Sequence, residues 1–210
     1  MVRVNLMCDT LKASHAFIHY KRLFSEPRRP DSVPPCNTLG ADTVILHAGA
    51  DYSHDAQRQS LEELLPSAQR IGVRIALENL PGQGFSRALP LVREFDHEML
   101  GYCLDTGHAV LNDSQGFDDL SDAEANLSKL YSLHLHDNDG SGDTHRLPFT
   151  GTVPWKRIAG LIADSPYTGC LTFEVMSTNE SYSDHAAFLQ EALSRGRAFD
   201  AMVAEASHDL

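Results

Sequence analysis

The chain has 210 residues, 42% hydrophobic and 22% charged, which predicts one globular domain over residues 1–210 with a buried core. The net charge of −12, counted with neutral histidines, disfavours nucleic acid as a partner because an acidic surface repels phosphate backbones. No apolar run reaches the roughly 18 residues of a membrane-spanning helix and no signal peptide is evident, so we expect a cytoplasmic protein without a membrane partner.

Short apolar segments alternate with longer amphipathic ones along the chain, a pattern typical of a parallel α/β protein. Six segments are predicted strands: VRVNLM (2–7), TVILHAG (43–49), RIALENL (74–80), GYCLDTG (101–107), LYSLHLHD (130–137) and CLTFEVM (170–176). Helices are predicted over 56–71, 87–98, 119–130, 155–163 and 184–204. Pro66 interrupts the first of these patterns, and four prolines within residues 25–40 predict a loop there.

Five of the predicted strands close with a polar residue on the same face as the small or apolar residues before it. Thr43, Ile45 and His47 alternate in this way on one strand. The corresponding closing residues of the other strands are Glu78, Asp105, His134 and Glu174. Because parallel strands in a barrel bring their C-terminal ends to one mouth, where active sites lie, we predict that these side chains form a ring there.

Two glutamates, one aspartate and one histidine cannot all be buried and ionised without a compensating cation. Mixed carboxylate and imidazole ligands suit Mn²⁺, Co²⁺, Zn²⁺ or Fe²⁺. Each residue also has a structural interpretation: Glu78 as a charge at a helix N-terminus, Asp105 as an Asx turn and His134 as a hydrogen-bonded core histidine. Their repetition at the same strand position favours a metal site.

Several segments resemble the xylose isomerase-like barrels, a superfamily of sugar isomerases and epimerases that also contains AP endonucleases of the endonuclease IV type. These segments are ENLPGQG (78–84), LDTGH (104–108), HLHD (134–137), DTHRLPFTGTVPW (143–155) and FEV (173–175), and the resemblance covers about residues 13 to 200. It implies an α/β fold of the TIM (β/α)8 type.

In the isomerases and epimerases of this superfamily, one divalent ion is held by Glu, Asp, His and Glu. By resemblance these ligands fall on Glu78, Asp105, His134 and Glu174. The two glutamates there also move the substrate proton, which implies catalytic roles for Glu78 and Glu174 through a metal-stabilised enediolate. The cofactor would then be one divalent metal, Mn²⁺, Co²⁺ or Zn²⁺.

A small carbohydrate is the partner that this resemblance implies. His108, three residues after Asp105, is similar to the substrate-orienting histidine of the family. Further side chains expected around the substrate are His47, His136, His145 and Arg146. We expect His136 to lie further out at the mouth than His134, as a substrate contact or behind the ligands.

The endonucleases of the superfamily bind three zinc ions with nine side chains, and the resemblance offers additional metal ligands for such a set. These are His15, His47, His108, Asp143 and His145. The sequence is therefore interpreted as a metal-dependent sugar or sugar-phosphate isomerase or epimerase, with a zinc-dependent AP endonuclease and a non-catalytic barrel as the alternatives. The acidic charge favours the first.

The N-terminal part of the chain is short for such a barrel, which typically needs about 250 residues. The residues before Thr43 offer one clear strand. We therefore predict that the first one or two βα units are missing or shortened. Lost strands would leave an open sheet edge, which favours a homo-oligomer.

Overall fold

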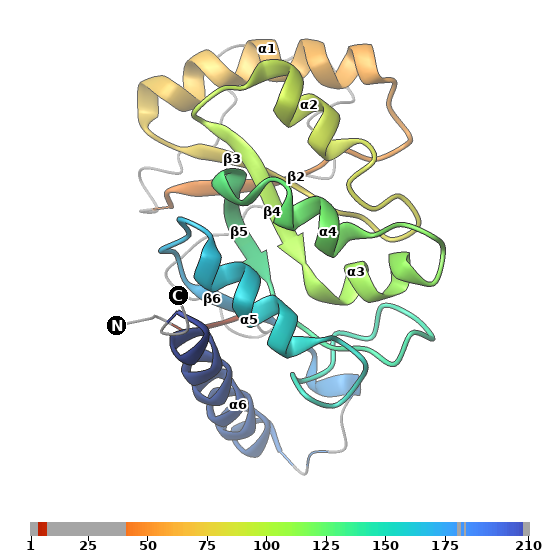
Figure 1. Cartoon of the computed structure of the whole chain (residues 1–210), viewed down its shortest axis with the longest axis vertical. Coiled ribbons are helices and arrows are strands. Elements are labelled where there is room, and N and C mark those ends of the chain that lie inside the picture. Colours follow the sequence, from red (N-terminus) through yellow and green to blue (C-terminus); the bar gives the residue numbers. More distant parts are fainter. Residues whose placement is uncertain (1–3, 8–40, 180–181, 183, 208–210) are drawn as a thin grey trace.

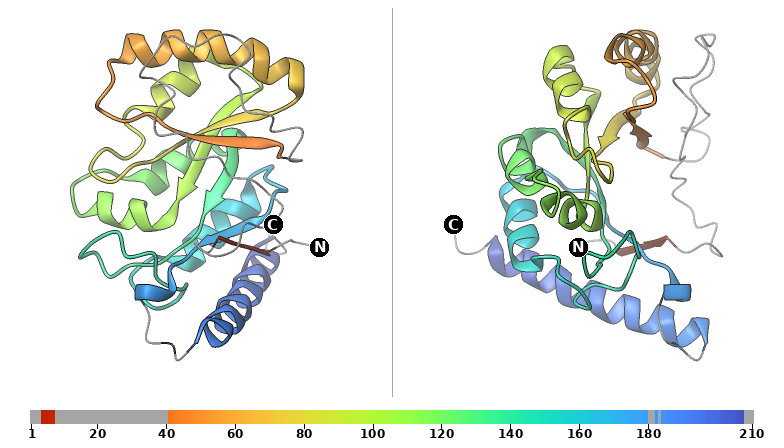
Figure 2. Two further views of the ribbon diagram at one scale, coloured as in Figure 1. Left: turned by 180° about the vertical axis from the view of Figure 1, so that it is seen from behind. Right: turned by 90° about the vertical axis from the view of Figure 1, so that its right-hand side faces the viewer.

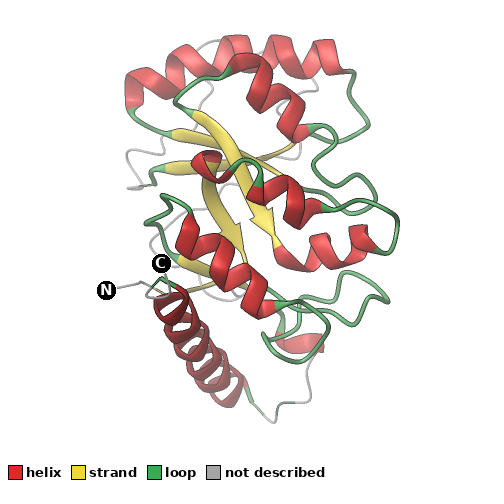
Figure 3. Ribbon diagram, in the orientation of Figure 1, coloured by secondary structure: helices red, strands yellow, loops and turns green. Residues whose placement is uncertain are grey.

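The computed structural model describes residues 4–7, 41–179, 182 and 184–207, along which strands and helices alternate (Figure 1, Figure 3). The strands are β1 (Val4–Met7), β2 (Thr43–His47), β3 (Arg74–Glu78), β4 (Leu100–Asp105), β5 (Leu130–His134) and β6 (Leu171–Glu174). The helices are α1 (His54–Ile71), α2 (Ala88–Phe95), α3 (Thr106–Asp113), α4 (Asp119–Glu124), α5 (Trp155–Asp164) and α6 (His185–Ala206). Two 3-10 turns, η2 (Leu127–Lys129) and η3 (Ser177–Asn179), complete the described elements.

The strands are parallel and follow one another in the order β2-β3-β4-β5, with a second pair formed by β6 and β1. A bridge between Leu135 and Phe173 joins β5 to β6. The first strand therefore lies beside the last, which is the neighbour relation that closes a barrel. Helices α1 to α6 form an arc round these strands (Figure 2).

The two faces of the sheet pack against different neighbours. Outward-facing strand residues such as Leu46 and Leu77 belong to the main core, which they share with the helices. A smaller cluster inside the curve contains Ile45, Ala76 and Cys103. These three lie two residues before His47, Glu78 and Asp105, so the alternation predicted from the sequence is confirmed.

Helix α1 continues through an internal proline, Pro66. Ser53 caps its N-terminus by accepting a hydrogen bond from the Ala56 N–H at 3.2 Å, and Gly72 ends it in the left-handed conformation. Pro66 lies on the exposed side of the helix, where water can satisfy the carbonyl that loses its helical donor.

The single helix predicted over 119–130 is wrong, because the segment divides into α4 and η2. The side-chain amide of Asn126 donates a hydrogen bond to the Asp122 carbonyl at 2.7 Å, taking the acceptor that a continuing helix would use.

The N-terminal predictions fall largely on residues that the structure does not describe. The proline-rich loop over 25–40, the shortened βα units and His15 all lie outside the described residues. Among the described strands β2 pairs with β3 alone, and the homo-oligomer stays a prediction. None of the described helices is long and apolar enough to span a membrane.

Candidate metal centre

Each strand from β2 to β6 ends at a residue of the predicted ring: His47, Glu78, Asp105, His134 and Glu174. The strand register places His47 beside Glu78, and Asp105 beside His134. The predicted ring at the C-terminal end of the sheet is thus brought together by the strands themselves.

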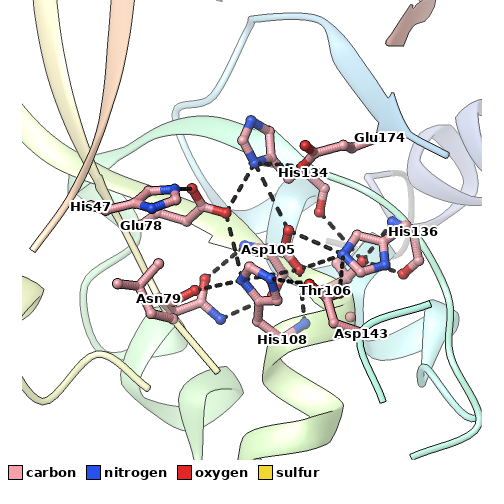
Figure 4. Close-up of polar contacts among 12 residues, drawn as sticks. His47, Glu78, Asn79, Asp105, Thr106, His108, His134, His136, Asp143 and Glu174 are labelled. Carbon is pink, nitrogen blue, oxygen red and sulfur yellow. Dashed lines mark hydrogen bonds and ion pairs between the residues drawn. The ribbon is translucent and has the colours of Figure 1, made fainter. Parts of the chain in front are cut away.

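Four of these residues form one compact cluster. Glu78, Asp105, His134 and Glu174 each offer a ligand atom, and these atoms all lie within 4.8 Å of one another. The Nδ1 atom of His134 lies 3.1 Å from Glu78 Oε1 and 3.0 Å from Glu174 Oε2. Figure 4 shows these two glutamates approaching Nδ1 from different directions. The Asp105 Oδ2 atom is 3.8 Å from the same nitrogen.

The donor atoms of this cluster fit one divalent ion. Ligands about 2.1 Å from a common ion stand about 3.0 Å apart in an octahedron and about 3.4 Å apart in a tetrahedron. The separations of 3.0, 3.1 and 3.8 Å around His134 lie close to these values. Three carboxylates beside one imidazole also form a donor set that needs a cation, so the four residues could hold a Mn²⁺-, Co²⁺- or Zn²⁺-like ion.

The acidic and basic side chains of the cluster shift one another's pKa values. Burial raises the pKa of Glu78, but the His134 and His47 imidazoles reverse this and hold the pKa well below its usual range. Burial likewise raises the pKa of Glu174, and His134 brings it down to about 2. Burial lowers the pKa of His134, yet the surrounding acidic groups raise it well above its usual value. The carboxylates thus require a positive charge between them. In the protein without a metal ion, the His134 imidazolium provides this charge.

The sequence left two roles open for Asp105, a metal ligand and a local backbone cap, and the geometry is compatible with both. Asp105 is the N-cap of α3, where its Oδ1 accepts a hydrogen bond from the His108 N–H at 2.8 Å. Its other oxygen faces His134. Helix α3, which was not predicted, therefore begins directly after β4 and carries His108 back toward the cluster on its first turn.

A second group of ionisable side chains lies next to the first. Asp143 Oδ2 is 3.3 Å from both His108 Nε2 and His145 Nε2, while Asp143 Oδ1 is 3.7 Å from His136 Nε2. The His145 ring stacks on His136 with centroids 4.1 Å apart. His145 has a φ of 46°, a left-handed conformation that is strained for this residue type and common at functional sites.

His136 lies beyond the end of β5, as expected, but its side chain is buried. Its Nε2 is 2.9 Å from Asp105 Oδ1. The strand register pairs His134 with Asp105, and His134 rather than His136 joins the four-residue cluster, while the choice of His134 as the metal ligand stays a prediction. The contact with Asp105 places His136 behind a candidate ligand.

The other two predicted substrate contacts differ in position. His47 Nε2 lies 2.9 Å from Glu78 Oε2, with 26% of the His47 side chain exposed. The guanidinium of Arg146 lies 3.7 Å from Asp139 Oδ2. His47 therefore flanks the cluster directly, whereas a role for Arg146 stays a prediction.

Asp137 has a structural function that the sequence did not reveal. Its buried carboxylate accepts hydrogen bonds from the backbone N–H groups of Asn138, Thr150 and Val153 and from the Trp155 indole N–H. These contacts close the loop that carries Asp143 and His145. The sequence signal was the His-x-x-Asp spacing from His134, which gave no indication of this role.

Comparison with known proteins places this architecture in a family. Residues 31–192 match the family model described as a xylose isomerase-like TIM barrel. The chain belongs to the xylose isomerase-like TIM barrel family. The predicted fold class is thereby confirmed.

Individual relatives of this xylose isomerase-like barrel are longer than the chain. Protein y4fM of Sinorhizobium fredii (strain NBRC 101917 / NGR234) is 29% identical over 185 residues, which cover 80% of this chain and 58% of that protein. The structure of a D-tagatose 3-epimerase-like protein aligns with a TM-score of 0.61 and 22% identity, over 80% of this chain and 65% of that one. The IOLI protein with a binding zinc atom aligns with a TM-score of 0.61 and 18% identity, over 81% and 66%. These structures support the fold.

We expect the chelator-treated barrel to lose thermal stability as the pH rises. Burial lowers the pKa of His145 and of His108, but Asp143 and, for His108, Asp105 reverse this and raise the two values to about 9 and about 10. A raised pKa stabilises the fold fully below the ordinary value of 6.5, and this stabilisation disappears as the pH passes the raised value. The melting temperature measured in EDTA from pH 6 to pH 10 should therefore fall.

The Asp143→Asn variant is the matched control, because it removes the carboxylate shared by both imidazoles. Its melting temperature should depend less on pH over the same range. A melting temperature that rises with pH in the chelated wild-type protein would contradict the assigned ion pairs.

Proposed function

We propose that the protein is a divalent metal-dependent isomerase or epimerase acting on a small sugar or sugar phosphate. The observation that carries this proposal is the placement of two ionised glutamates, Glu78 and Glu174, whose carboxylates lie 3.1 and 3.0 Å from the same His134 nitrogen (Figure 4). Two carboxylates around one reacting centre allow a two-base mechanism, in which one group removes a proton from carbon and the other returns one.

The chain's own groups supply the proton chemistry of this proposal. A divalent ion bound by Glu78, Asp105, His134 and Glu174 would polarise the carbonyl and neighbouring hydroxyl of an open-chain ketose. One glutamate removes the proton from the carbon beside the carbonyl and becomes neutral, leaving an enediolate. The other returns a proton to carbon, and for this the site must take up one proton from solvent when the substrate binds, because both carboxylates are ionised in the free protein. Return to the opposite face gives an epimer, and return to the neighbouring carbon gives an isomer.

The histidines round the cluster would orient the sugar hydroxyls. His108 and His145 share Asp143, and His47 touches Glu78 from the exposed side. Imidazoles held by carboxylates have fixed orientations, which favours directional hydrogen bonds to a bound hydroxyl. We propose these three as substrate contacts and His136, from its burial against Asp105, as a support for that ligand.

Hydrogen exchange in D₂O tests the proposal. The protein loaded with Mn²⁺ or Co²⁺ is incubated with a panel of ketoses and ketose phosphates, and NMR follows deuterium at the carbons beside the carbonyl. We expect deuterium incorporation into at least one of them and its loss after treatment with EDTA. Exchange that persists at full rate in EDTA would contradict a metal-dependent mechanism.

An AP endonuclease is the second candidate, favoured by the additional ligands around Asp143, which lies 3.3 Å from nitrogens of two histidines. A nuclease must also hold DNA phosphates, which the net charge of −12 disfavours. The zinc-loaded protein should therefore leave an abasic duplex intact at physiological salt. Zinc-dependent nicking of that duplex would replace the isomerase proposal and leave the fold unchanged.

A further inference from the structure

A buried carboxylate outside the four-residue cluster, that of Asp119, lies at the first residue of α4 and is 1% exposed. Its Oδ2 accepts hydrogen bonds from the side-chain amides of Asn79 and Asn112, each at 2.8 Å. Its Oδ1 accepts one from the backbone N–H of Phe85 at 3.1 Å. These three donors satisfy a group that, when ionised, can only accept hydrogen bonds.

Asn79 connects Asp119 to the candidate metal centre, because it directly follows Glu78 at the end of β3. Its Oδ1 accepts a hydrogen bond from the Asp105 N–H at 2.7 Å, and its Nδ2 donates one to the Asp105 carbonyl at 2.9 Å. One side-chain amide thus holds both backbone groups of a candidate ligand. The backbone carbonyl of Asn79 also lies 2.8 Å from His108 Nδ1 (Figure 4).

Asp119 and the backbone of Asp105 together fix the direction of the Asn79 amide. Turned by 180°, this amide would present its NH₂ group to the Asp105 N–H, and its oxygen would face the Asp119 carboxylate. A donor would then face a donor, and an acceptor would face an acceptor, in a buried space. The free energy of this arrangement is far higher than that of the observed pairing. Asp119 therefore adds to the preference that the Asp105 N–H and carbonyl already impose, and holds the amide in the orientation that contacts Asp105.

The backbone carbonyl of Asn79 also orients the His108 imidazolium, which carries hydrogen on both ring nitrogens. A backbone carbonyl can only accept, so Nδ1 donates to the Asn79 carbonyl. The other nitrogen, Nε2, is directed at Asp143, 3.3 Å away. Asn79 thus positions one candidate ligand and one candidate substrate contact.

We propose that Asp119 is a positioning residue for the metal centre, acting through the Asn79 side chain on Asp105. This inference rests on the proposed metal-dependent function. Groups that orient metal ligands from behind affect metal affinity by about 10- to 100-fold when they are removed. A role limited to stabilising α4 would leave the affinity of the folded protein unchanged.

Titration of the full chain with Co²⁺ alone tests this proposal, read by calorimetry and by the visible absorption bands of the bound ion, which report ligand geometry. We expect Asp119→Asn, which keeps the size of the side chain and removes its charge, to weaken Co²⁺ binding about 10- to 100-fold and to alter the bands. The matched control is Asp118→Asn, the same change at the exposed neighbour that caps α4 and contacts Ser121. It should leave affinity and spectrum unchanged.

The outcomes separate this inference from the proposed function. A folded Asp119→Asn variant with wild-type Co²⁺ affinity and spectrum would overturn the positioning role, whatever its melting temperature. If that variant does not fold, Asn79→Ala, which keeps the Asp119 contacts to Asn112 and Phe85, must show the same loss of affinity. A wild-type protein that binds no Co²⁺ would overturn the proposed function, and this inference with it.

Discussion

Replacing Glu174 with glutamine is expected to abolish proton exchange at the carbon beside the carbonyl of a ketose, with a loss of about 10³-fold or more. Glu174 Oε2 lies 3.0 Å from His134 Nδ1, and a pKa of about 2 keeps the carboxylate ionised at neutral pH. Glutamine has nearly the same size but neither the charge that attracts a metal ion nor a site that accepts a proton. Deuterium incorporation followed by NMR measures the effect.

A control variant and a measurement at saturating metal show whether the loss of exchange is specific to Glu174. Glu124→Gln is the matched control, because it removes a surface carboxylate 2.7 Å from the Arg157 guanidinium and should not change exchange. Measuring Glu174→Gln at saturating Mn²⁺ separates loss of the base from loss of the ion, since metal analysis then shows whether the site is filled. Exchange at the wild-type rate in Glu174→Gln would remove this residue from the mechanism.

Replacing Gly107 with alanine is expected to destabilise the fold by roughly 3 kcal/mol, the upper end of the cost of overpacking a core. A Cβ atom at Gly107 would lie 2.0 Å from His136 Cε1 and 2.3 Å from its Nδ1. The His136 ring cannot withdraw freely, because it is buried and His145 stacks on it at 4.1 Å. Urea unfolding of the chelated protein gives the free energy of unfolding directly.

The effect should reach the metal centre as well, because His136 contacts Asp105 at 2.9 Å. Metal affinity of any folded Gly107→Ala protein is therefore expected to fall. The control is Gly160→Ala within α5, where nothing lies within 4 Å of the added Cβ and alanine favours the helix by up to about 1 kcal/mol. A Gly107→Ala protein as stable as Gly160→Ala would show that the packing round His136 is looser than described.

The ring of ligand candidates could be predicted because it depends on a local rule. Strand residues alternate between faces, and the polar residue closing each strand, from His47 to Glu174, shares its face with small residues such as Ala76 and Cys103. Parallel pairing then brings these strand ends together without further information.

The supporting residues could not be predicted, because their roles arise from tertiary contacts. Asn79 and Asp105 are far apart in sequence and meet only when β3 lies beside β4. The sequence placed Asp119 at the start of a predicted helix. The residues next to it in the sequence do not indicate whether its carboxylate is buried as a hydrogen-bond acceptor or exposed as a surface charge. Helix α3 depends on Asp105 as its cap, while Gly107 in its first turn weakens the helical pattern in the sequence.

Anomalous diffraction from crystals of the protein loaded with Mn²⁺ or Co²⁺ tests the metal centre most directly. We predict one ion peak bounded by side-chain atoms of Glu78, Asp105, His134 and Glu174, each about 2.0 to 2.3 Å away, the usual range for nitrogen and oxygen ligands. An ion held elsewhere, or at this place without His134 and both glutamates among its ligands, would contradict the metal centre and the mechanism built on it.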